Sequence, residues 1–208
     1  MYLIVNGGVY SDELKNTEES ILLANNQSNI DGVMVNVFFS SDGELVINEN
    51  DLIESNYYIS QLSYDEIKKI KRFSKLKKIQ IPLLKDIVKR YKKEILVINL
   101  HSNFENNLEL ANELHKILQN CSINKIVINV NNLGLYEYFK KNNYEVYFDN
   151  NSKIIFIDIK TINVNDKTIK SIKTNNNYIA NLIINNQFIE DNIYIVSNNP
   201  SLLLKKIN

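Results

Sequence analysis

Short apolar runs rich in β-branched residues recur along the chain, separated by segments in which apolar residues return every three or four positions. Several runs are continuously apolar, which is typical of strands covered on both faces, as in a parallel sheet. The predicted strands cover residues 2–5, 32–39, 44–47, 95–100, 125–130, 144–148, 153–159, 178–184 and 192–196.

Helical spacing appears between these runs. Residues 83–91 place Leu84, Ile87 and Val88 at positions i, i+3 and i+4, and Pro82 suits a first helical position. Helices are also predicted at residues 18–24, 107–118, 133–139 and 200–206.

Alternating strands and helices predict an α/β fold. About eight core strands plus a hairpin favour a small (β/α)₈ TIM barrel, formed as a single domain over residues 1–208. The connections around residues 149–152 and 185–191 are too short for full helices. We therefore expect the outer ring of helices to be incomplete.

Composition restricts the classes of partner and the cellular compartment that we expect for this protein. Lys and Arg total 24 and Asp and Glu total 24, so no global field favours nucleic acid, and none is expected as a partner. The single Cys121 excludes an intramolecular disulfide. The sequence shows neither a signal peptide nor an apolar run as long as a membrane span, so we expect a cytoplasmic protein. Asparagine is abundant throughout, so a single asparagine is weak evidence of function.

Basic residues concentrate in IKKIKRFSKLKKIQ, residues 67–80. We interpret this stretch as the solvated face of a helix, with Ile67, Ile70 and Phe73 turned inward. The alternative is binding of an anionic polymer, with an affinity that falls steeply as salt increases.

Several stretches, in matching order and spacing, resemble the glycerophosphodiester phosphodiesterases (GDPDs), a TIM-barrel family. The first strand ends Asn6-Gly7-Gly8 where the family has His-Arg-Gly. GVMVNVFFSSDGELVINEND keeps the frame of the family's second strand, its Asp-Gly turn and a strand ending His-Asp. ISQLSYDEIKKI, IPLLKDIVKRY, ILVINLHSN and IYIVSNNPSLLLKKI are similar to later family segments. The resemblance spans nearly the whole chain and implies the GDPD barrel, with a short insertion after the second strand.

The chemistry that the resemblance implies depends on a divalent cation held by carboxylates and on two proton-carrying histidines. Here no residue of this constellation is kept. The replacements are Asn6 and Gly7 for the His-Arg pair, Met34 and Asn36 for two carboxylates, Glu49 and Asn50 for the His-Asp pair, Asn99 for a third carboxylate and His101 for a lysine. An asparagine amide does not carry protons, and a methionine sulfur suits a hard cation poorly. We expect no metal and no cofactor.

The residues that replace this constellation are polar and, by the resemblance, lie at the carboxyl ends of strands, where TIM barrels build their sites. The expected ligand-binding residues are Asn6, Asn36, Glu49, Asn50, Asn99 and His101. This set predicts a site for a small uncharged polar ligand, such as a sugar or polyol. The alternative is a pocket that no longer binds a specific ligand and is filled by water and asparagine side chains.

Two classes of function follow from this set. The first is a catalytically degenerate GDPD-like protein that acts as a binding or protein-interaction module. The second is a metal-independent enzyme on a sugar, polyol or phosphodiester, with Glu49 and His101 as acid and base. The enzyme hypothesis predicts that these two side chains converge within about 3–6 Å, directly or through water.

Other ionisable or reactive residues have weaker claims. Asp158 is a third ionisable candidate at a strand end. His115 lies beside the apolar stripe of a helix and is interpreted as structural. Cys121 precedes a strand and lacks a nearby basic neighbour on the predicted catalytic face, so its interpretation as a nucleophile is weak. Asn16 or Thr17 is expected to cap the first helix.

Overall fold

The computed structural model describes residues 2–9, 15–53, 56–70, 72–74, 77–101, 107–148, 154–157 and 194–197. The predicted strand 178–184, the predicted helix 200–206, the two short connections and Asp158 lie outside the described residues.

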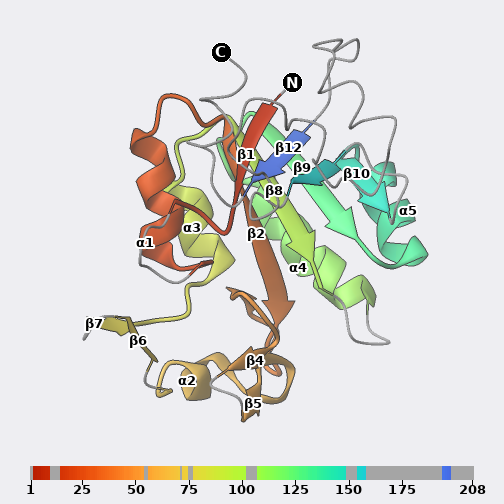
Figure 1. Cartoon of the computed structure of the whole chain (residues 1–208). Helices are drawn as coiled ribbons and strands as arrows, with labels where there is room; N and C mark the ends of the chain where they lie inside the picture. Colours follow the sequence, from red (N-terminus) through yellow and green to blue (C-terminus); the bar gives the residue numbers. More distant parts are fainter. Residues whose placement is uncertain are drawn as a thin grey trace.

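Eight of the described strands form one curved sheet at the centre of the molecule (Figure 1). Neighbouring strands along the order β10-β9-β8-β2-β1-β12-β11 are all parallel. The strands are β1 (Tyr2–Asn6), β2 (Gly32–Phe39), β8 (Ile95–Leu100), β9 (Lys125–Val130), β10 (Glu145–Phe148), β11 (Ile154–Ile157) and β12 (Tyr194–Ser197). With its helices this sheet has the α/β architecture of a (β/α)₈ barrel, as the sequence predicts.

A hairpin extends β2 at its carboxyl end. The antiparallel strand β3 (Leu45–Ile47) pairs with β2, and Gly43 in the turn has φ +87°, a conformation that favours glycine. The hairpin predicted at Asp42-Gly43 is therefore confirmed.

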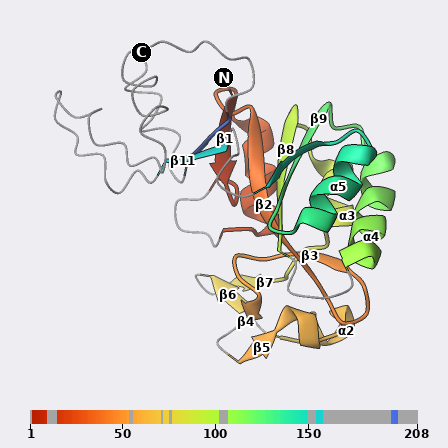
Figure 2. The same cartoon turned by 90° about the vertical axis from the view of Figure 1, so that its right-hand side faces the viewer.

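Helices cover the outer face of the sheet (Figure 2). They are α1 (Glu18–Leu23), followed by the 3₁₀ turn η1 (Ala24–Asn26), α3 (Leu84–Arg90), α4 (Asn107–Gln119) and α5 (Leu133–Lys141). Alternate strand residues such as Val35 and Ile98 pack against these helices. The intervening residues, including Ile4, Met34 and Val97, form a separate buried cluster inside the barrel. The strands are thus apolar on both faces, and polar side chains on the inner face need a separate explanation.

Residues 48–83 form the insertion between β3 and α3. It contains the hairpin β4 (Leu52–Ile53)–β5 (Tyr57–Tyr58), η2 (Ile59–Gln61), α2 (Tyr64–Ile67) and the hairpin β6 (Arg72–Ser74)–β7 (Lys77–Ile79). Figures 1 and 2 both show these elements gathered beyond the end of β2. Buried residues such as Ile53, Ile67 and Ile81 give the insertion a core of its own, which joins the barrel at Phe38 and Val46.

Two local predictions are wrong. Residues 67–80 are not one helix, because α2 ends at Ile67 and the strands β6 and β7 follow. The chain then runs extended, which buries Ile79 and Ile81 at alternate positions, a spacing that a helix does not give. Pro82 does not open α3, because the helix begins at Leu84 with Leu83 as its N-cap. None of the described helices is both long and apolar enough to cross a bilayer.

Candidate ligand site

Three asparagines lie side by side where β2, β8 and β9 approach their carboxyl ends. Asn36 on β2 is directly opposite Asn99 on β8, and Asn99 is directly opposite Asn129 on β9. Each follows a buried inner-face residue by two positions, so all three side chains stand on the inner face of the barrel. Two of them were predicted from the sequence and one was not.

The three side-chain amides form a continuous hydrogen-bonded row, which we call the amide row. Asn129 Nδ2 donates to Asn99 Oδ1 at 3.1 Å, and Asn99 Nδ2 donates to Asn36 Oδ1 at 3.0 Å. Asn36 Nδ2 then donates to the backbone carbonyl of Glu49 at 3.0 Å. The row therefore ties three barrel strands to Glu49, two residues beyond the end of β3.

His101 adjoins the amide row one step beyond β8. Its Nε2 lies 3.0 Å from Asn99 Nδ2, and its ring stacks on Phe38 with centroids 4.7 Å apart and planes 6° apart. Burial lowers the pKa of His101 below its usual value, although the charge of Asp51 acts in the opposite direction. The ring is therefore held in its neutral form more strongly than an exposed histidine.

Asn16 positions β2 within the site. Its Oδ1 accepts the backbone N–H of Asn36 at 2.9 Å, and its side chain is almost fully buried. Its Nδ2 has no hydrogen-bond partner in the described structure. The helix cap is Thr17 instead, which forms a reciprocal capping box with Ser20 at the start of α1. The prediction of a cap is confirmed at Thr17.

The turn after β1 is fixed by close backbone contacts. Gly7 donates its N–H to Met34 O at 2.8 Å and accepts from Ser20 Oγ at 2.8 Å. Its φ of +72° favours glycine, and an added Cβ would lie 2.8 Å from Lys15 Cβ. An arginine, which the family has at this position, would therefore be strained here. Asn6, the last residue of β1, is directly opposite Met34.

Glu49 and Asn50 lie beyond β3 with exposed side chains. Asn48 fixes this segment, because its backbone N–H donates to Asn36 O at 3.2 Å and its Nδ2 donates to Asn50 O at 2.7 Å. Among the described residues, no hydrogen bond or ion pair joins the Glu49 carboxylate to His101. Their joint acid/base role stays a prediction.

The residues at the family's metal positions do not fit a divalent cation. Met34 is buried inside the barrel and presents only a soft sulfur. The Oδ1 atoms of Asn36 and Asn99 each already accept a hydrogen bond within the amide row. Within the described part of the chain, no three His, Cys, Asp or Glu side chains converge on a common point.

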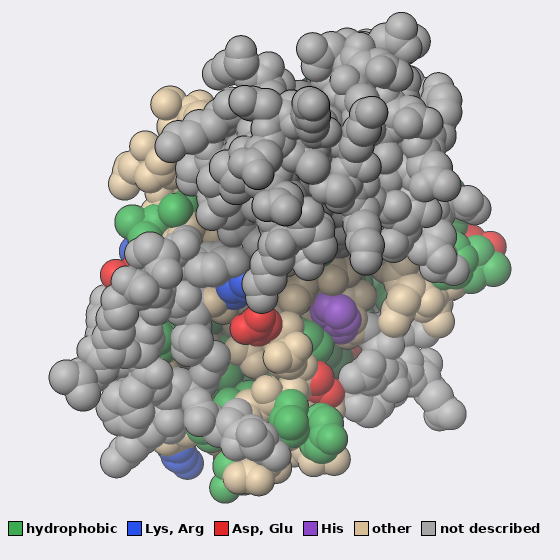
Figure 3. Space-filling model, in the orientation of Figure 1, with side chains coloured by type: hydrophobic (Ala, Val, Ile, Leu, Met, Phe, Trp, Pro, Cys, Tyr) green, Lys and Arg blue, Asp and Glu red, His purple; other side chains and the backbone are tan. Residues whose placement is uncertain are grey.

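The remaining candidates lie away from the amide row. His115 on α4 has structural partners, because its Nδ1 lies 2.9 Å from Tyr144 Oη and its Nε2 lies 2.6 Å from Gln119 Nε2. Cys121 follows α4 and borders a small cleft between α3 and α4. On the described part of the face in Figure 3, acidic and basic side chains are few and do not cluster by sign.

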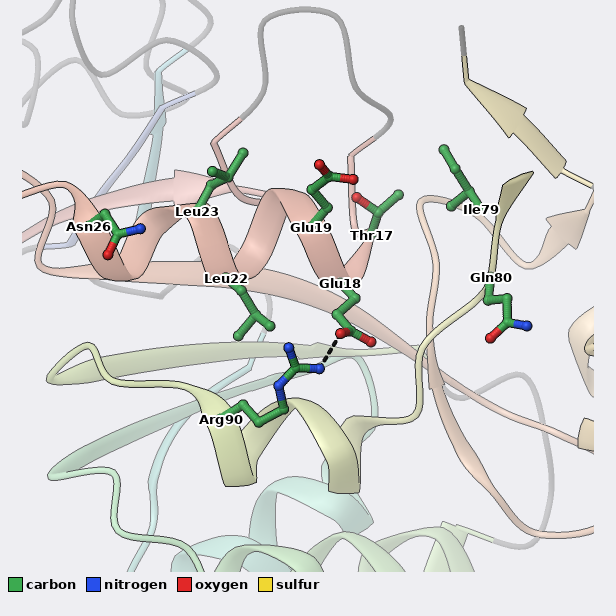
Figure 4. Close-up of a pocket in the computed structure, with 9 residues that line it drawn as sticks. All are labelled: Thr17, Glu18, Glu19, Leu22, Leu23, Asn26, Ile79, Gln80 and Arg90. Atoms are coloured by element: carbon green, nitrogen blue, oxygen red, sulfur yellow. Dashed lines mark hydrogen bonds and ion pairs between the residues drawn. The ribbon is translucent and has the colours of Figure 1, made fainter. Parts of the chain in front are cut away.

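A second cavity, of about 570 Å³, lies between α1, α3 and the segment after β7 (Figure 4). The ion pair between Glu18 and Arg90 spans it, so the two charges offset each other. Leu22 and Leu23 supply apolar walls on the α1 side. No sequence prediction points to this cavity.

Comparison with known proteins supports the barrel fold independently of the sequence motifs. No family model and no curated protein sequence matches the chain. Solved structures do match. A glycerophosphodiester phosphodiesterase from Parabacteroides distasonis has a TM-score of 0.73 at 16% identity, over 99% of this chain and 96% of that one.

Two further structures agree. A phosphodiesterase from Oleispira antarctica, in complex with the product sn-glycerol-3-phosphate, has a TM-score of 0.72 at 18% identity, over 100% of this chain and 96% of that one. A GDPD from Thermotoga maritima has a TM-score of 0.65 at 15% identity, over 99% and 97%. The chain has the GDPD fold. The resemblance that the sequence motifs predicted is thus confirmed for the architecture of this GDPD-like protein.

Asn129 is the site residue that sequence reasoning missed. It lies in VINV, which repeats the pattern of VINL around Asn99 and VNV around Asn36. An asparagine that interrupts a buried strand two residues beyond an inner-face residue is the common signal. The pattern marks one layer of the barrel, and it becomes visible once the three strands are compared with each other.

Proposed function

We propose that this GDPD-like protein is catalytically degenerate and acts as a binding module for a small uncharged polar ligand at the carboxyl ends of the barrel strands. The observation that carries the proposal is the amide row of Asn36, Asn99 and Asn129. The row lies on the inner face where the resemblance implies metal-binding carboxylates, and amides provide neither their charge nor a titratable proton.

Two features of the surrounding residues support the same proposal. His101 is held neutral beside the row and is stacked on Phe38, which limits its movement toward a reacting group. Gly7, at the family's arginine position, offers no cation to a phosphate. The amide row is therefore rich in neutral donors and acceptors, and the charges named near it, those of Glu49 and Asp51, are negative.

Hydrolysis is the first test. Purified protein is incubated with glycerophosphocholine or glycerophosphoethanolamine in the presence of Ca²⁺ or Mg²⁺, and free glycerol 3-phosphate is measured. We expect no turnover above the buffer blank, while a phosphodiesterase of the same fold serves as the positive control. Metal-dependent turnover that survives further purification would refute the proposal.

Glu49 and His101 allow the metal-independent alternative to be tested in the same assay with EDTA present. Turnover that is lost in both Glu49→Gln and His101→Gln, but kept in His115→Gln, would support an enzyme. Absence of turnover with phosphodiesters, together with ligand-induced stabilisation in a thermal-shift screen of sugars and polyols, supports the binding module.

A further inference from the structure

The direction of every hydrogen bond in the amide row follows from one backbone atom. The carbonyl of Glu49 can only accept, so the Asn36 atom 3.0 Å away is the NH₂ group. The oxygen of Asn36 therefore faces Asn99 and requires a donor there. The oxygen of Asn99 in turn faces Asn129, which must present its NH₂ group. All three amides point the same way.

This order fixes the state of His101. Both hydrogens of the Asn99 amide are committed, one to Asn36 and one toward Nε2 of His101, 3.0 Å away. A ring nitrogen that faces an NH₂ group must present its lone pair. The neutral ring of His101 then carries its proton on Nδ1 and offers an N–H donor there.

The amide row also ends with an unused acceptor. Asn129 donates to Asn99, so its Oδ1 points away from the row, and the described structure gives that oxygen no partner. The Asn129 side chain is only half-buried. Asn36 has a second N–H beyond the one given to Glu49, so donors and an acceptor are both available.

The spacing of these groups limits the size of what they can bind. Adjacent strands lie about 4.8 Å apart, so the row from β2 through β8 to β9 spans about 10 Å. A sugar ring or a short polyol can lie across this span and reach both ends with its hydroxyl groups. Hydroxyls donate and accept at once, which matches the mixed polarity of the row.

We propose that Asn129 and His101 are the specificity-determining residues of this site, which selects a neutral polyhydroxy ligand over a phosphorylated one. A ligand hydroxyl donates to Asn129 Oδ1, and another accepts from His101 Nδ1–H. The dianionic phosphate group of a phosphate monoester has acceptor oxygens only, so it would place an oxygen against Asn129 Oδ1 without a proton between them. The inference rests on the proposed function and adds the ligand class and the residues that select it.

The state of His101 is tested without any ligand. In ¹⁵N-labelled protein at about pH 8, the ring nitrogens of His101 report the position of the proton. We expect Nδ1 to be protonated and Nε2 to be the lone-pair nitrogen. The opposite tautomer would reverse the order of the amide row and overturn the inference.

Ligand selection is tested on the same sample. Glycerol, myo-inositol and glucose are titrated in parallel with sn-glycerol 3-phosphate and inorganic phosphate, while the Asn side-chain amide signals are followed. We expect at least one neutral probe to shift the Asn129 amide signals and to bind at least about tenfold more tightly than either phosphate, the value of about one hydrogen bond. Equal or tighter binding of phosphate, or no shift with any neutral probe, would overturn the inference.

Two variants separate selection from folding. Asn129→Leu keeps the approximate size of the side chain but removes the Oδ1 acceptor, and should weaken the binding of the neutral probe about tenfold or more. Asn26→Leu is the matched control, because Asn26 is an exposed residue of η1 and is not part of the amide row. If Asn129→Leu stays folded by circular dichroism and binds the neutral probe like the wild type, the role of Asn129 is refuted. Loss of selection leaves the hydrolysis test unaffected, so the two proposals fail separately.

Discussion

A side-chain amide carries no charge at any physiological pH, and it donates and accepts hydrogen bonds at once. Asn36, Asn99 and Asn129 can therefore stand on adjacent strands and satisfy one another. Carboxylates at the same places would repel each other unless a cation lay between them. At the scale of single residues, the three amides thus satisfy one another without a cation between them.

Asn99 is the centre of the row, so its removal should be the most damaging single change there. Asn99→Leu leaves Asn36 Oδ1, Asn129 Nδ2 and His101 Nε2 without their partner. We expect the free energy of unfolding to fall by about 1–3 kcal/mol. Urea unfolding measures the change, and Asn26→Leu, on an exposed side chain, should stay within about 0.5 kcal/mol of the wild type. Equal stability of both variants would contradict an energetic role for the row.

His101 should make stability depend on pH. Its native pKa lies below the usual 6.5, so the unfolded chain binds the proton more readily than the native chain. The free energy of unfolding should therefore be highest above about pH 6.5 and should fall as the pH drops toward the native pKa. Urea unfolding at about pH 8 and about pH 5.5 measures this difference.

The contribution of His101 is isolated by comparing two variants. His101→Gln should reduce the loss of stability between the two pH values, because the group that titrates is gone. His115→Gln, on α4, keeps His101 and should keep the loss. An unchanged pH dependence in His101→Gln would show that other groups cause it.

At the scale of elements, the strands that sequence reasoning predicted best are those with two buried faces. β8 and β9 coincide with the predicted residues 95–100 and 125–130, because short continuous runs rich in β-branched residues are typical of strands buried on both faces. The helix predicted over residues 67–80 is wrong, because this stretch is not a continuous apolar run. Isoleucines spaced among lysines fit a helical stripe, and the extended return of the chain through Ile79 and Ile81 is set by the insertion core.

The residues of the candidate site could be predicted from the sequence only in part. The resemblance placed Asn36, Asn99 and His101 at strand ends, and the structure brings these three together. Asn129 had no counterpart in the motifs that carried the resemblance. Its role depends on the register between β8 and β9, which is a contact between segments that the sequence does not specify locally.

Tyr91 links two central strands at their amino ends. Its hydroxyl accepts the N–H of Val33 on β2 and donates to the carbonyl of Ile95 on β8, both at 2.7 Å. Tyr91→Phe would leave these buried backbone groups without partners, so we expect a loss of about 1–3 kcal/mol in the free energy of unfolding. Tyr136→Phe on α5 is the control, because the described structure gives its hydroxyl no hydrogen bond. Similar stability of both variants would contradict the bridging role.

At the scale of the whole molecule, the chain has the GDPD fold, while the residues at the mouth of the barrel differ from those that the family resemblance implies. The turn at Gly7 and Gly8, the hairpin at Gly43 and the insertion core hold the same segments that the family resemblance predicts. Under the proposed function, the backbone positions of a metal site persist here while its ligands are replaced. Met34, Asn36 and Asn99 still share the inner face, with Asn36 and Asn99 directly opposite each other.

This persistence predicts how the protein responds to calcium. The wild type should show the same thermal midpoint with and without Ca²⁺, because its amide oxygens are engaged and Met34 is a poor ligand. The triple variant Met34→Glu/Asn36→Asp/Asn99→Glu should be less stable than the wild type without metal, since three carboxylates then repel each other in the barrel. Calcium should restore part of that loss, by about 2.7 kcal/mol at 100 times its dissociation constant. Differential scanning calorimetry measures both midpoints, and Mg²⁺ and Na⁺ at matched ionic strength separate site binding from screening. Stabilisation of the wild type by Ca²⁺ would show that its own residues hold the ion, and would contradict the metal-free site.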